Sequence, residues 1–538
     1  MKKTMKQYSF ASQLKSLAVV FGIALAFASC ANEDVAQNPT NPNEDNDKNL
    51  TTFVAGDEAK TRTSLDYNSS DFSWEKDDYI YVKDDDGVLR KSTNAPTQKV
   101  ASFKYKVPGK FTEHTSYKVY YLGKNSNATD KKVTISTAQT QTKPDNTEHF
   151  GTAGDYGTAT ATKVLNKQQF AFELEHQAAY LVFQPYTSNT VLHDCYLTKI
   201  EVTSDNDIAE TYTVNTSTDN LDASAVTDGK KIVLTTSGSS SNPNGFPLTN
   251  NSASVTTNGA YMIIKPGTHT LKVRYWVKDV ATNVVGTITK LLPSTAYALN
   301  TYYDMIANLD VKNYDGDHYY MWDAEKQYWE GYEWHNGGSQ PTLSQGVTGA
   351  TTSNDYAKSN ADSRYYNESY PGYGVSNPAT HSSCKDLPNA NEMSWYAIYG
   401  DPRWDGDELW TTMGHLYKGG MWFKKKSVLQ AENHYDIEKS ADGTTDLRIT
   451  YKYYENTNNS INNSGLPSAA DANKYFYLPA LGYYYFNQLY SVGTVGIYWS
   501  SSAYPLSSGV ADALDFRSGR VIVGNGYRHQ GFRAESLQ

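Results

Sequence analysis

A period-two alternation of apolar and polar residues is the feature that most limits how this chain can fold. In residues 271–278, four apolar residues of one parity alternate with Lys, Arg, Trp and Lys, as in a strand with one face on a core and one in water. Shorter runs of this kind lie at 79–82, 117–122, 180–183, 199–202, 232–234 and 261–264. Turn formers such as Asp-Gly at 228–229 separate them. With no dependable helical period from 51 to 310, the pattern predicts a mainly β fold built from sandwiches.

Length and composition exclude several classes of protein. The 538 residues suffice for about three domains. Tyrosine is unusually frequent, at 44 residues against 17 Phe, which suits sheets with polar, adhesive outer faces. The formal charge is −10, and all four charges in residues 1–29 are lysines, so the rest of the chain carries −14. So acidic a chain argues against nucleic acid as a partner, and three cysteines exclude a disulfide scaffold.

The N-terminus predicts export and lipidation. Residues 1–29 combine a basic start with an apolar run at 17–27, too short to span a bilayer comfortably, and end in Ala28-Ser29 before Cys30. Small residues before a cysteine mark a lipoprotein signal, in which cleavage after Ser29 leaves Cys30 acylated, although Phe27 departs from the usual Leu. The alternative is an ordinary secretory signal with an accidental cysteine. Residues 30–50 are expected to be a disordered tether.

Two acidic residues close to Cys30, Glu33 and Asp34, resemble the surface-export signal of Bacteroidales lipoproteins. The resemblance implies a lipid-anchored protein on the outer face of the outer membrane. An acyl chain contributes about 0.8 kcal/mol per buried methylene, so a multiply acylated Cys30 would hold the chain firmly there.

A further resemblance covers residues 51–310. Thr61-Arg62-Thr63-Ser64 followed by Phe-Ser-Trp-Glu-Lys-Asp-Asp-Tyr-Ile at 72–80 resembles the opening of fimbrillin-like proteins of the Bacteroidales. Residues 172–179 resemble the strand that opens their second sandwich, and 297–309 resemble its closing strand. The resemblance implies two transthyretin-like β-sandwiches in series, at 51–165 and 166–310.

The same resemblance implies a mode of assembly. In fimbrillins an Arg-specific protease removes the first strand of the N-terminal sandwich, and a strand of another subunit fills the groove, held by backbone hydrogen bonds and side-chain pockets. Arg62 is the candidate cleavage site; the alternative is an ordinary surface arginine. Because the strand ending near Asp310 runs on into further chain, this subunit is expected to accept a strand but not to donate one.

The C-terminal part resembles a different family. After a predicted linker at 311–345, residues 346–538 resemble the C-type-lectin-like and formylglycine-generating-enzyme-like fold, of the Fibrobacter major paralogous type. The similarity rests on 384–395, with Leu387-Pro388 and Trp395, and on 476–483, 496–502 and 531–533, in the order of that α+β fold. Asn389 is placed to cap a helix over 390–399, and 513–516 and 520–523 are predicted strands joined by Ser-Gly at 518–519.

Chemistry is not expected from these residues, and neither a cofactor nor a metal is predicted. Formylglycine generation needs a pair of reactive cysteines, and this domain has Cys384 alone. Cys195 lies in another domain, so two unpaired, buried thiols are favoured over a disulfide. The serines at 500–502 lack a Gly-x-Ser-x-Gly turn and are read as structural. The histidines show no metal-binding spacing.

Acidic residues at 401–407 resemble the start of a twelve-residue EF-hand calcium loop. The twelfth position of such a loop needs a bidentate carboxylate, and here it is Thr412, so an EF-hand is excluded. An irregular calcium site and an exposed acidic loop both stay open. The Glu-Pro-Asn and Gln-Pro-Asp triplets of calcium-dependent lectins are absent from the sequence. Aromatic clusters, which suit sugars or protein partners, occur at 319–322, 328–334, 365–366 and 483–485, and half or more are expected in the core.

The favoured hypothesis is therefore a non-enzymatic fimbrial tip subunit. Its expected partners are other fimbrillin subunits, the outer membrane through its lipid, and a glycan or protein receptor for the C-terminal head. Two alternatives stay open: a fimbrial anchor subunit that keeps its lipid, and a glycan-binding surface lipoprotein that never polymerises.

Overall fold

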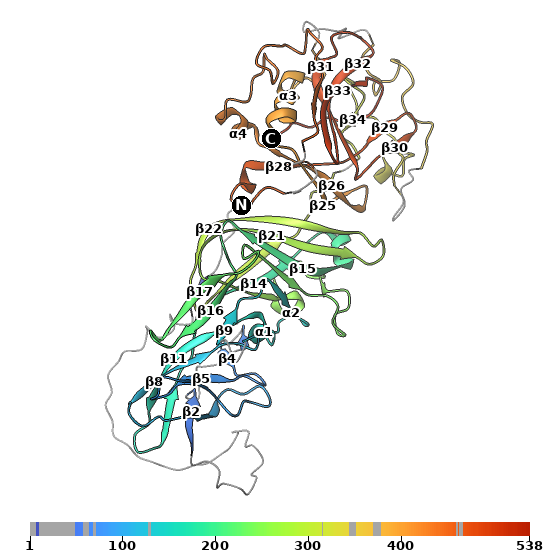
Figure 1. Cartoon of the computed structure of the whole chain (residues 1–538). Coiled ribbons are helices and arrows are strands. Elements are labelled where there is room, and N and C mark those ends of the chain that lie inside the picture. Colours follow the sequence, from blue (N-terminus) through green and yellow to red (C-terminus); the bar gives the residue numbers. More distant parts are fainter. Residues whose placement is uncertain are drawn as a thin grey trace, which may run out of the picture. The chain divides into compact units, whose positions relative to one another are not determined.

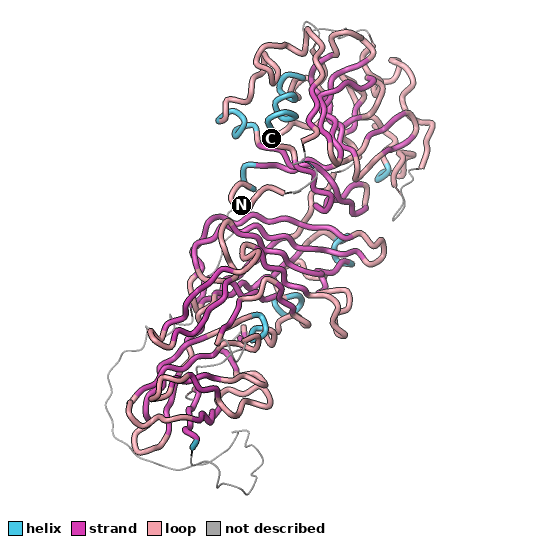
Figure 2. The backbone as a smooth tube through the Cα atoms, in the orientation of Figure 1, coloured by secondary structure: helices cyan, strands magenta, loops and turns pink. Residues whose placement is uncertain are grey.

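A computed structural model describes residues 7–9, 49–56, 64–67, 71–126, 131–314, 316–343, 351–368, 378–458, 461 and 466–538. The chain is mainly β, with 42% of residues in strands and 8% in helices (Figure 2). It divides into two compact units. Unit 1 comprises Met1–Ser188, Tyr196–Tyr275 and Leu292–Leu309, and unit 2 comprises Asn189–Cys195, Trp276–Leu291 and Asp310–Gln538.

The N-terminal part of unit 1 is one eight-stranded sheet. Its strand order is β6 (Leu89–Lys91), β5 (Ile80–Lys83), β8 (Ser116–Tyr121), β11 (Gly157–Lys163), β12 (Gln169–Phe172), β2 (Leu50–Ala55) and β7 (Phe103–Pro108), with β13 (Glu175–His176) paired to β11. A hairpin, β3 (Ser64–Asp66) and β4 (Asp71–Ser73), precedes β5 in the chain.

This sheet closes on itself around a single core. Directly after β6, the Thr93 N–H donates to the Lys106 carbonyl on β7 (2.8 Å), and the Asn94 side chain accepts from the Lys106 N–H (2.7 Å). The core inside consists of inward-facing side chains of every long strand, such as Phe53, Tyr105, Val119 and Phe170, together with Trp74, which follows β4. Closure removes exposed edges from most of the sheet.

The rest of unit 1 is a second layered module. One sheet has the order β1 (Gln7–Ser9), β23 (Thr301–Asn308), β14 (Ala179–Tyr186), β20 (Ala260–Ile264). The other contains β10 (Ala138–Thr140), β18 (Lys231–Thr235), β15 (Cys195–Ser204), β21 (Gly267–Asp279) and β22 (Val285–Tyr297), with β19 (Phe246–Pro247) paired to β15. Of these strands, Cys195 and the parts of β21 and β22 within 276–291 are counted in unit 2. The rings of Phe183 on β14 and Tyr275 on β21 meet edge to face at 6.0 Å, so the two sheets face each other.

Smaller elements complete unit 1. A three-stranded sheet contains β17 (Asn220–Ala225), β16 (Glu210–Asn215) and β9 (Lys132–Thr134). The two α-helices described here, α1 (Phe150–Ala153) and α2 (Val255–Asn258), have one turn each, consistent with the lack of helical periodicity.

Unit 2 contains a six-stranded sheet and its partners (Figure 1). The order is β24 (Tyr319–Tyr320), β34 (Phe532–Arg533), β31 (Val495–Ala503), β32 (Val510–Arg517), β33 (Arg520–Tyr527), β27 (Tyr454–Asn456). Separate pairs join β25 (Arg403–Thr412) to β26 (His415–Lys424), β26 to β28 (Tyr475–Pro479), and β29 (Tyr483–Tyr485) to β30 (Gln488–Tyr490). Short helices are η3 (Thr190–Asp194), η4 (Trp334–Asn336), α4 (Lys426–Ala431) and η5 (Ala472–Lys474).

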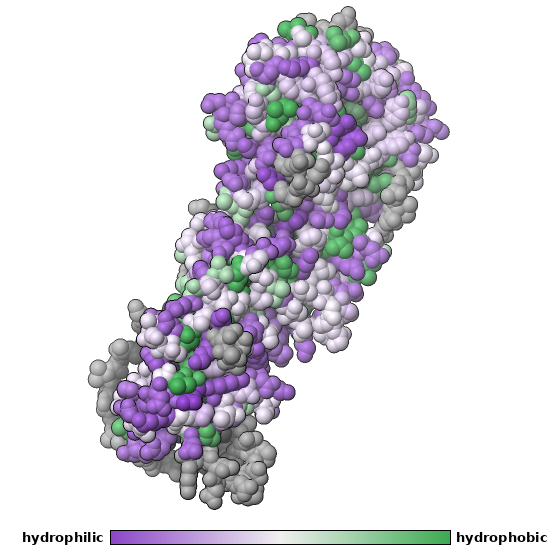
Figure 3. Space-filling view, viewed as in Figure 1, coloured by the Kyte–Doolittle hydropathy of each residue, from purple (hydrophilic) through white to green (hydrophobic). Residues whose placement is uncertain are grey.

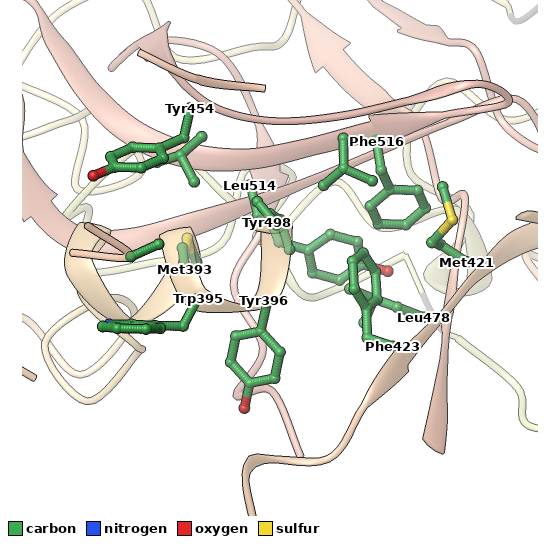
Figure 4. Close-up of a cluster of buried hydrophobic side chains, with 14 of the residues drawn as sticks. Met393, Trp395, Tyr396, Met421, Phe423, Tyr454, Leu478, Tyr498, Leu514 and Phe516 are labelled. Atoms are coloured by element: carbon green, nitrogen blue, oxygen red, sulfur yellow. The ribbon is translucent and has the colours of Figure 1, made fainter. Parts of the chain in front are cut away.

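The helix expected at 390–399 forms as α3 (Ala390–Tyr399). The Asn389 side chain accepts the Glu392 N–H (3.0 Å), and the Glu392 carboxylate accepts the Asn389 N–H (2.8 Å), a complete capping box. One face of α3 packs on the sheet through Met393 and Tyr396, which meet Leu514 and Phe516 of β32 in the core (Figure 4).

The predicted strands are confirmed in detail. The six shorter runs fall in β5, β8, β14, β15, β18 and β20, and the Ser-Gly turn at 518–519 joins β32 to β33. The alternation at 271–278 lies in β21, but its expected wet face is wrong in part, because Lys272 and Arg274 are only 6% and 8% exposed. Their long apolar stems allow such burial on a sheet face.

The expected end of the first sandwich and the expected linker both differ from what the strand pairing shows. Leu165, near which the first sandwich was expected to end, is 88% exposed at the turn between β11 and β12, and β12 and β13 still pair within the first sheet. Residues 311–345, expected as a linker, contribute Tyr319, Tyr328 and Trp329 to a core of unit 2, because β24 pairs with β34.

The outer surface is mostly hydrophilic on the face shown in Figure 3, with apolar side chains in small groups. Within the described residues, no helix combines the length and the apolar character needed to cross a bilayer.

Candidate functional site

The three residues predicted for processing, Ser29, Cys30 and Arg62, lie outside the described residues. The elements on both sides of Arg62 are described, however. Strand β2 precedes it and the β3–β4 hairpin follows it. The candidate site is therefore β2 with the groove that holds it.

Strand β2 is an internal strand rather than an edge. It runs parallel to β12, with Phe53 opposite Phe170, and antiparallel to β7, with Phe53 opposite Tyr105. The Gly56 N–H extends the pairing by donating to the Phe172 carbonyl at 3.1 Å. Its loss would leave the facing edges of β12 and β7 without their partner.

The side chains of β2 alternate between core and surface. Phe53 and Ala55 are fully buried, whereas Thr52 and Val54 are half-buried. The Phe53 ring stacks on Phe170 (centroids 5.2 Å apart, 17° between planes) and meets Phe111 edge to face at 5.1 Å. The groove thus has a large apolar pocket for Phe53 and, two residues on, a small one for Ala55.

An empty groove would be costly in water. Burial of a side chain such as Phe contributes about 1.5–3 kcal/mol, and removal of β2 would also uncover the walls of the pocket, including Phe170 and Phe111. Because backbone donors and apolar walls would be exposed together, the opened groove is suited to bind another extended strand.

The segment after Arg62 has anchors of its own. The Tyr67 hydroxyl donates to the Asp304 carboxylate on β23 (2.7 Å) and accepts from Gln184 on β14 (3.1 Å). Burial and the neighbouring Asp304 raise the pKa of Tyr67. Next in the chain, Trp74 is fully buried and pairs with Val100. A cut within 57–63 would therefore separate β2 from a segment that stays attached by independent contacts.

Strand β23 is the last strand of unit 1. It runs parallel to β14 over its whole length and antiparallel to β1, which falls in the predicted signal. The chain then continues through Asp310 into unit 2, where the Asp310 carboxylate accepts the Asn189 N–H at 3.2 Å. Strand β23 therefore leads directly into a folded unit, whereas β2 leads into residues 57–63, which contain the candidate cleavage site Arg62.

The acidic residues at 401–407 are engaged one by one with protein donors. Asp401 accepts from the Tyr475 hydroxyl (2.7 Å), Asp405 from the Trp422 indole N–H (3.1 Å), and Asp407 pairs with Lys418 (3.2 Å). Asp405 and Asp407 lie on strand β25, so these carboxylates do not converge in a calcium loop.

One other group has the composition of a metal site within the described residues: Asp85, Glu113 and His114. Asp85 already accepts from the Thr112 N–H and from the Tyr117 hydroxyl, and these hydrogen bonds help to lower its pKa to about 2. Through these hydrogen bonds, Asp85 joins two loops of the first sheet.

The remaining sequence candidates are structural. Ser500 donates to the Asp512 carbonyl (2.8 Å), and Ser502 accepts the Ala390 N–H at the start of α3. Cys195 and Cys384 are buried free thiols, as favoured, and burial raises the pKa of each thiol to about 12. Of the aromatic clusters, the fully buried members are Tyr319, Trp322, Tyr328, Trp329 and Tyr484.

Comparison with known proteins finds solved structures of low sequence identity and low TM-score. No family model and no curated protein matches the sequence. Similar solved structures include a candidate cell adhesion protein from Bacteroides ovatus, with 14% identity and a TM-score of 0.30 over 48% of this chain and 93% of that one. A fimbrial protein from Bacteroides ovatus has 10% identity and a TM-score of 0.27 over 90% and 98%. The fimbrial anchor protein Mfa2 from Porphyromonas gingivalis has 12% identity and 0.21 over 46% and 82%.

These structures are those of Bacteroidales cell adhesion and fimbrial proteins. At such TM-scores we rest the function on this chain's own strands and residues.

Proposed function

We propose that this chain is a subunit of a surface fimbrium that receives a strand from another subunit in place of its own β2. The two modules of unit 1 are the transthyretin-like sandwiches of a fimbrillin, and residues 346–538 within unit 2 are a C-type-lectin-like head. The precursor is lipidated at Cys30, reaches the outer membrane, and is cut at Arg62 before assembly.

One observation carries this proposal: a short strand near the N-terminus lies inside a closed sheet. β2 comes before residues 57–63 in the chain, yet pairs on both sides with later strands, β12 and β7. A single cut in that segment, which contains Arg62, would free β2 alone. The segment that follows is retained by Tyr67 and Trp74.

The position in the fimbrium follows from the two ends of unit 1. The β2 groove can accept a strand, but β23 is followed by a folded unit and cannot be threaded into a neighbour without displacing it. A subunit that accepts and does not donate ends the filament. We therefore place this chain at the tip, with unit 2 as the adhesive part.

The test is the N-terminus of this chain within purified filaments. Mass spectrometry of filaments from wild-type cells should find a chain that begins at Thr63. An Arg62→Ala variant should keep its N-terminal segment and be absent from filaments. An Arg90→Ala variant is the matched control, since Arg90 pairs with Asp84 elsewhere in unit 1 and should not affect cleavage.

Each other result selects a different function. A chain that retains an acylated Cys30 within filaments refutes the tip position and identifies an anchor subunit. A chain that is never found with a shorter pilin refutes the fimbrial function and favours a glycan-binding surface lipoprotein.

A further inference from the structure

The charged side chains on the strands of the first sheet are almost all of one sign. Apart from the short β13, these strands carry seven basic residues and no acidic one, although the whole chain has a net charge of −10. The seven are Lys83, Arg90, Lys91, Lys104, Lys106, Lys118 and Lys163. Asp219 balances the first of them (2.8 Å) and Asp84 the second (2.7 Å). The other five lysines leave the sheet with a basic outer face.

Two of these lysines lie beside the groove that holds β2. In the antiparallel pairing of β2 with β7, Lys104 is directly opposite Val54, and Lys106 is directly opposite Thr52. On each strand the residue between the two belongs to the core, so all four side chains share the outer face. The Cβ atoms of residues that face each other in this way are about 4.5–5.5 Å apart. A side chain at either outer position of the strand in the groove can therefore reach a lysine.

Strand β2 itself makes no use of this positive charge. Thr52 and Val54 are neutral, and so are their partners on β12, Gln169 and Ala171. Lys104 is exposed and forms no ion pair with any residue that the structure describes. A replacement strand with acidic residues at these two outer positions would gain attractions across the strand pair that β2 lacks.

We propose that the donor strand carries an acidic residue on each side of the large residue that fills the Phe53 pocket, and that Lys104 and Lys106 select it by charge. The two outer positions flank the Phe53 position, so this pattern is the same whichever way the donor runs. The inference rests on the proposed function, the replacement of β2 by another strand. It adds the chemistry of the partner: an extended acidic segment of another subunit.

The first test uses purified wild-type filaments. A carbodiimide joins an amine to a carboxylate that already contacts it and adds no spacer. Treatment of the filaments should join Lys104 or Lys106 to an Asp or Glu of another subunit, next to a large apolar residue, and mass spectrometry identifies the product. Lys118 is the matched control. It is exposed on β8, three strand spacings from β2 or about 14 Å, and should not be joined to the same segment.

The second test measures the effect of charge in the full chain. In an Arg62→Ala background, which keeps β2 in place, Thr52 and Val54 are both replaced by Glu, or both by Gln, which has the same shape without the charge. Opposite charges across a strand pair contribute about 0.2–1 kcal/mol each, so peptides that cover β7 should exchange hydrogen about 2- to 30-fold more slowly in the Glu variant. The difference should shrink in about 1 M salt. It should disappear when Lys104 and Lys106 are both replaced by Gln.

Three results would overturn the inference: filaments in which neither Lys104 nor Lys106 is joined to another subunit, an equal yield of the same product at Lys118, or equal exchange in the Glu and Gln variants. A chain that begins at Thr63 within filaments but holds a neutral or basic strand in its groove refutes this inference alone. A chain that is absent from filaments refutes the proposed function and this inference with it, whatever the exchange experiment shows.

Discussion

Truncation of Phe53 should affect the stability of the uncut precursor but not that of the assembled subunit, because in the proposed function β2 is removed before assembly. Phe53 is fully buried and is held between Phe170 and Phe111. In the uncut chain, Phe53→Ala removes these contacts and leaves a cavity, which should lower the stability of the first sheet by about 3–5 kcal/mol. Thr52→Ala, on the half-buried face of the same strand, is the control and should change it by no more than about 0.5 kcal/mol.

Hydrogen exchange measures this effect locally, which matters because a multidomain chain has no single free energy of unfolding. An Arg62→Ala background keeps β2 in place during the measurement. Peptides that cover β7 and β12 should then exchange faster in Phe53→Ala than in the parent. Peptides from α3 in unit 2 should be unchanged.

The same variant should behave differently in filaments. If β2 is removed before assembly, Phe53→Ala filaments should dissociate in detergent at the same temperature as wild-type filaments. Phe170→Ala should weaken both states, because Phe170 belongs to the groove and stays. Filaments weakened by Phe53→Ala as much as the precursor would show that β2 remains in the assembled subunit, and the reasoning would fail.

Two further predictions concern pH and helix capping. Burial lowers the pKa of His149 from 6.5 to about 4. Because the folded state disfavours the charged imidazole, the contribution of His149 to the free energy of unfolding is complete above about pH 6.5. It declines as pH falls towards 4, with about 2 kcal/mol lost by pH 5. His149→Gln should remove most of the pH dependence of hydrogen exchange in peptides that cover α1, measured between pH 7 and 5 and corrected for the intrinsic exchange rate, and an unchanged pH dependence would contradict this. Asn389→Ala should lower the local stability of α3, measured by hydrogen exchange, by about 0.5–2 kcal/mol, whereas Asn389→Ser should keep most of the cap; equal exchange in the two variants would argue against the capping box.

Local features of the fold could be predicted, because their causes lie within a few residues. Asn389 and Glu392 are one helical turn apart, and their reciprocal hydrogen bonds define the start of α3 at the expected residue. The Ser-Gly turn at 518–519 likewise joins two strands that are adjacent in the chain. In both cases, sequence distance and spatial distance coincide.

Contacts between distant residues could not be predicted in this way. Tyr67 and Asp304 are separated by 237 positions, and nothing near Tyr67 distinguishes it from the other tyrosines. The cavity of about 280 Å³ in unit 2 is lined by residues of five strands, β29, β31, β32, β33 and β34, and two of its lining residues, Gly524 and Asp515, are ordinary strand residues until β32 and β33 are paired. The aromatic residues of 319–329 lie in a predicted linker, and half or more of such clusters are expected in the core, but only the pairing of β24 with β34 shows which of them are buried.

The shape of the β2 groove makes a final prediction about the donor strand. Because β12 and β7 run in opposite directions, any replacement strand finds one parallel and one antiparallel partner, whichever way it runs. Backbone pairing therefore does not select the donor. The side-chain pockets do: one accepts the Phe53 ring, and the other, two residues on, holds only the methyl group of Ala55.

A labelled peptide with the β2 sequence, Leu-Thr-Thr-Phe-Val-Ala, should therefore bind the cut chain in a fluorescence anisotropy assay. Replacing its last residue by Phe should overfill the small pocket and cost about 1–3 kcal/mol, roughly 5- to 150-fold in affinity. Replacing its Phe by Ala should weaken binding through lost burial. Equal affinity of the parent peptide and the two-Phe peptide would mean that the Ala55 pocket does not select the donor. If the affinities follow the expected order, the donor strand of the partner subunit should carry a large residue followed two positions later by a small one. A strand that runs the other way should carry the same two residues in reverse order.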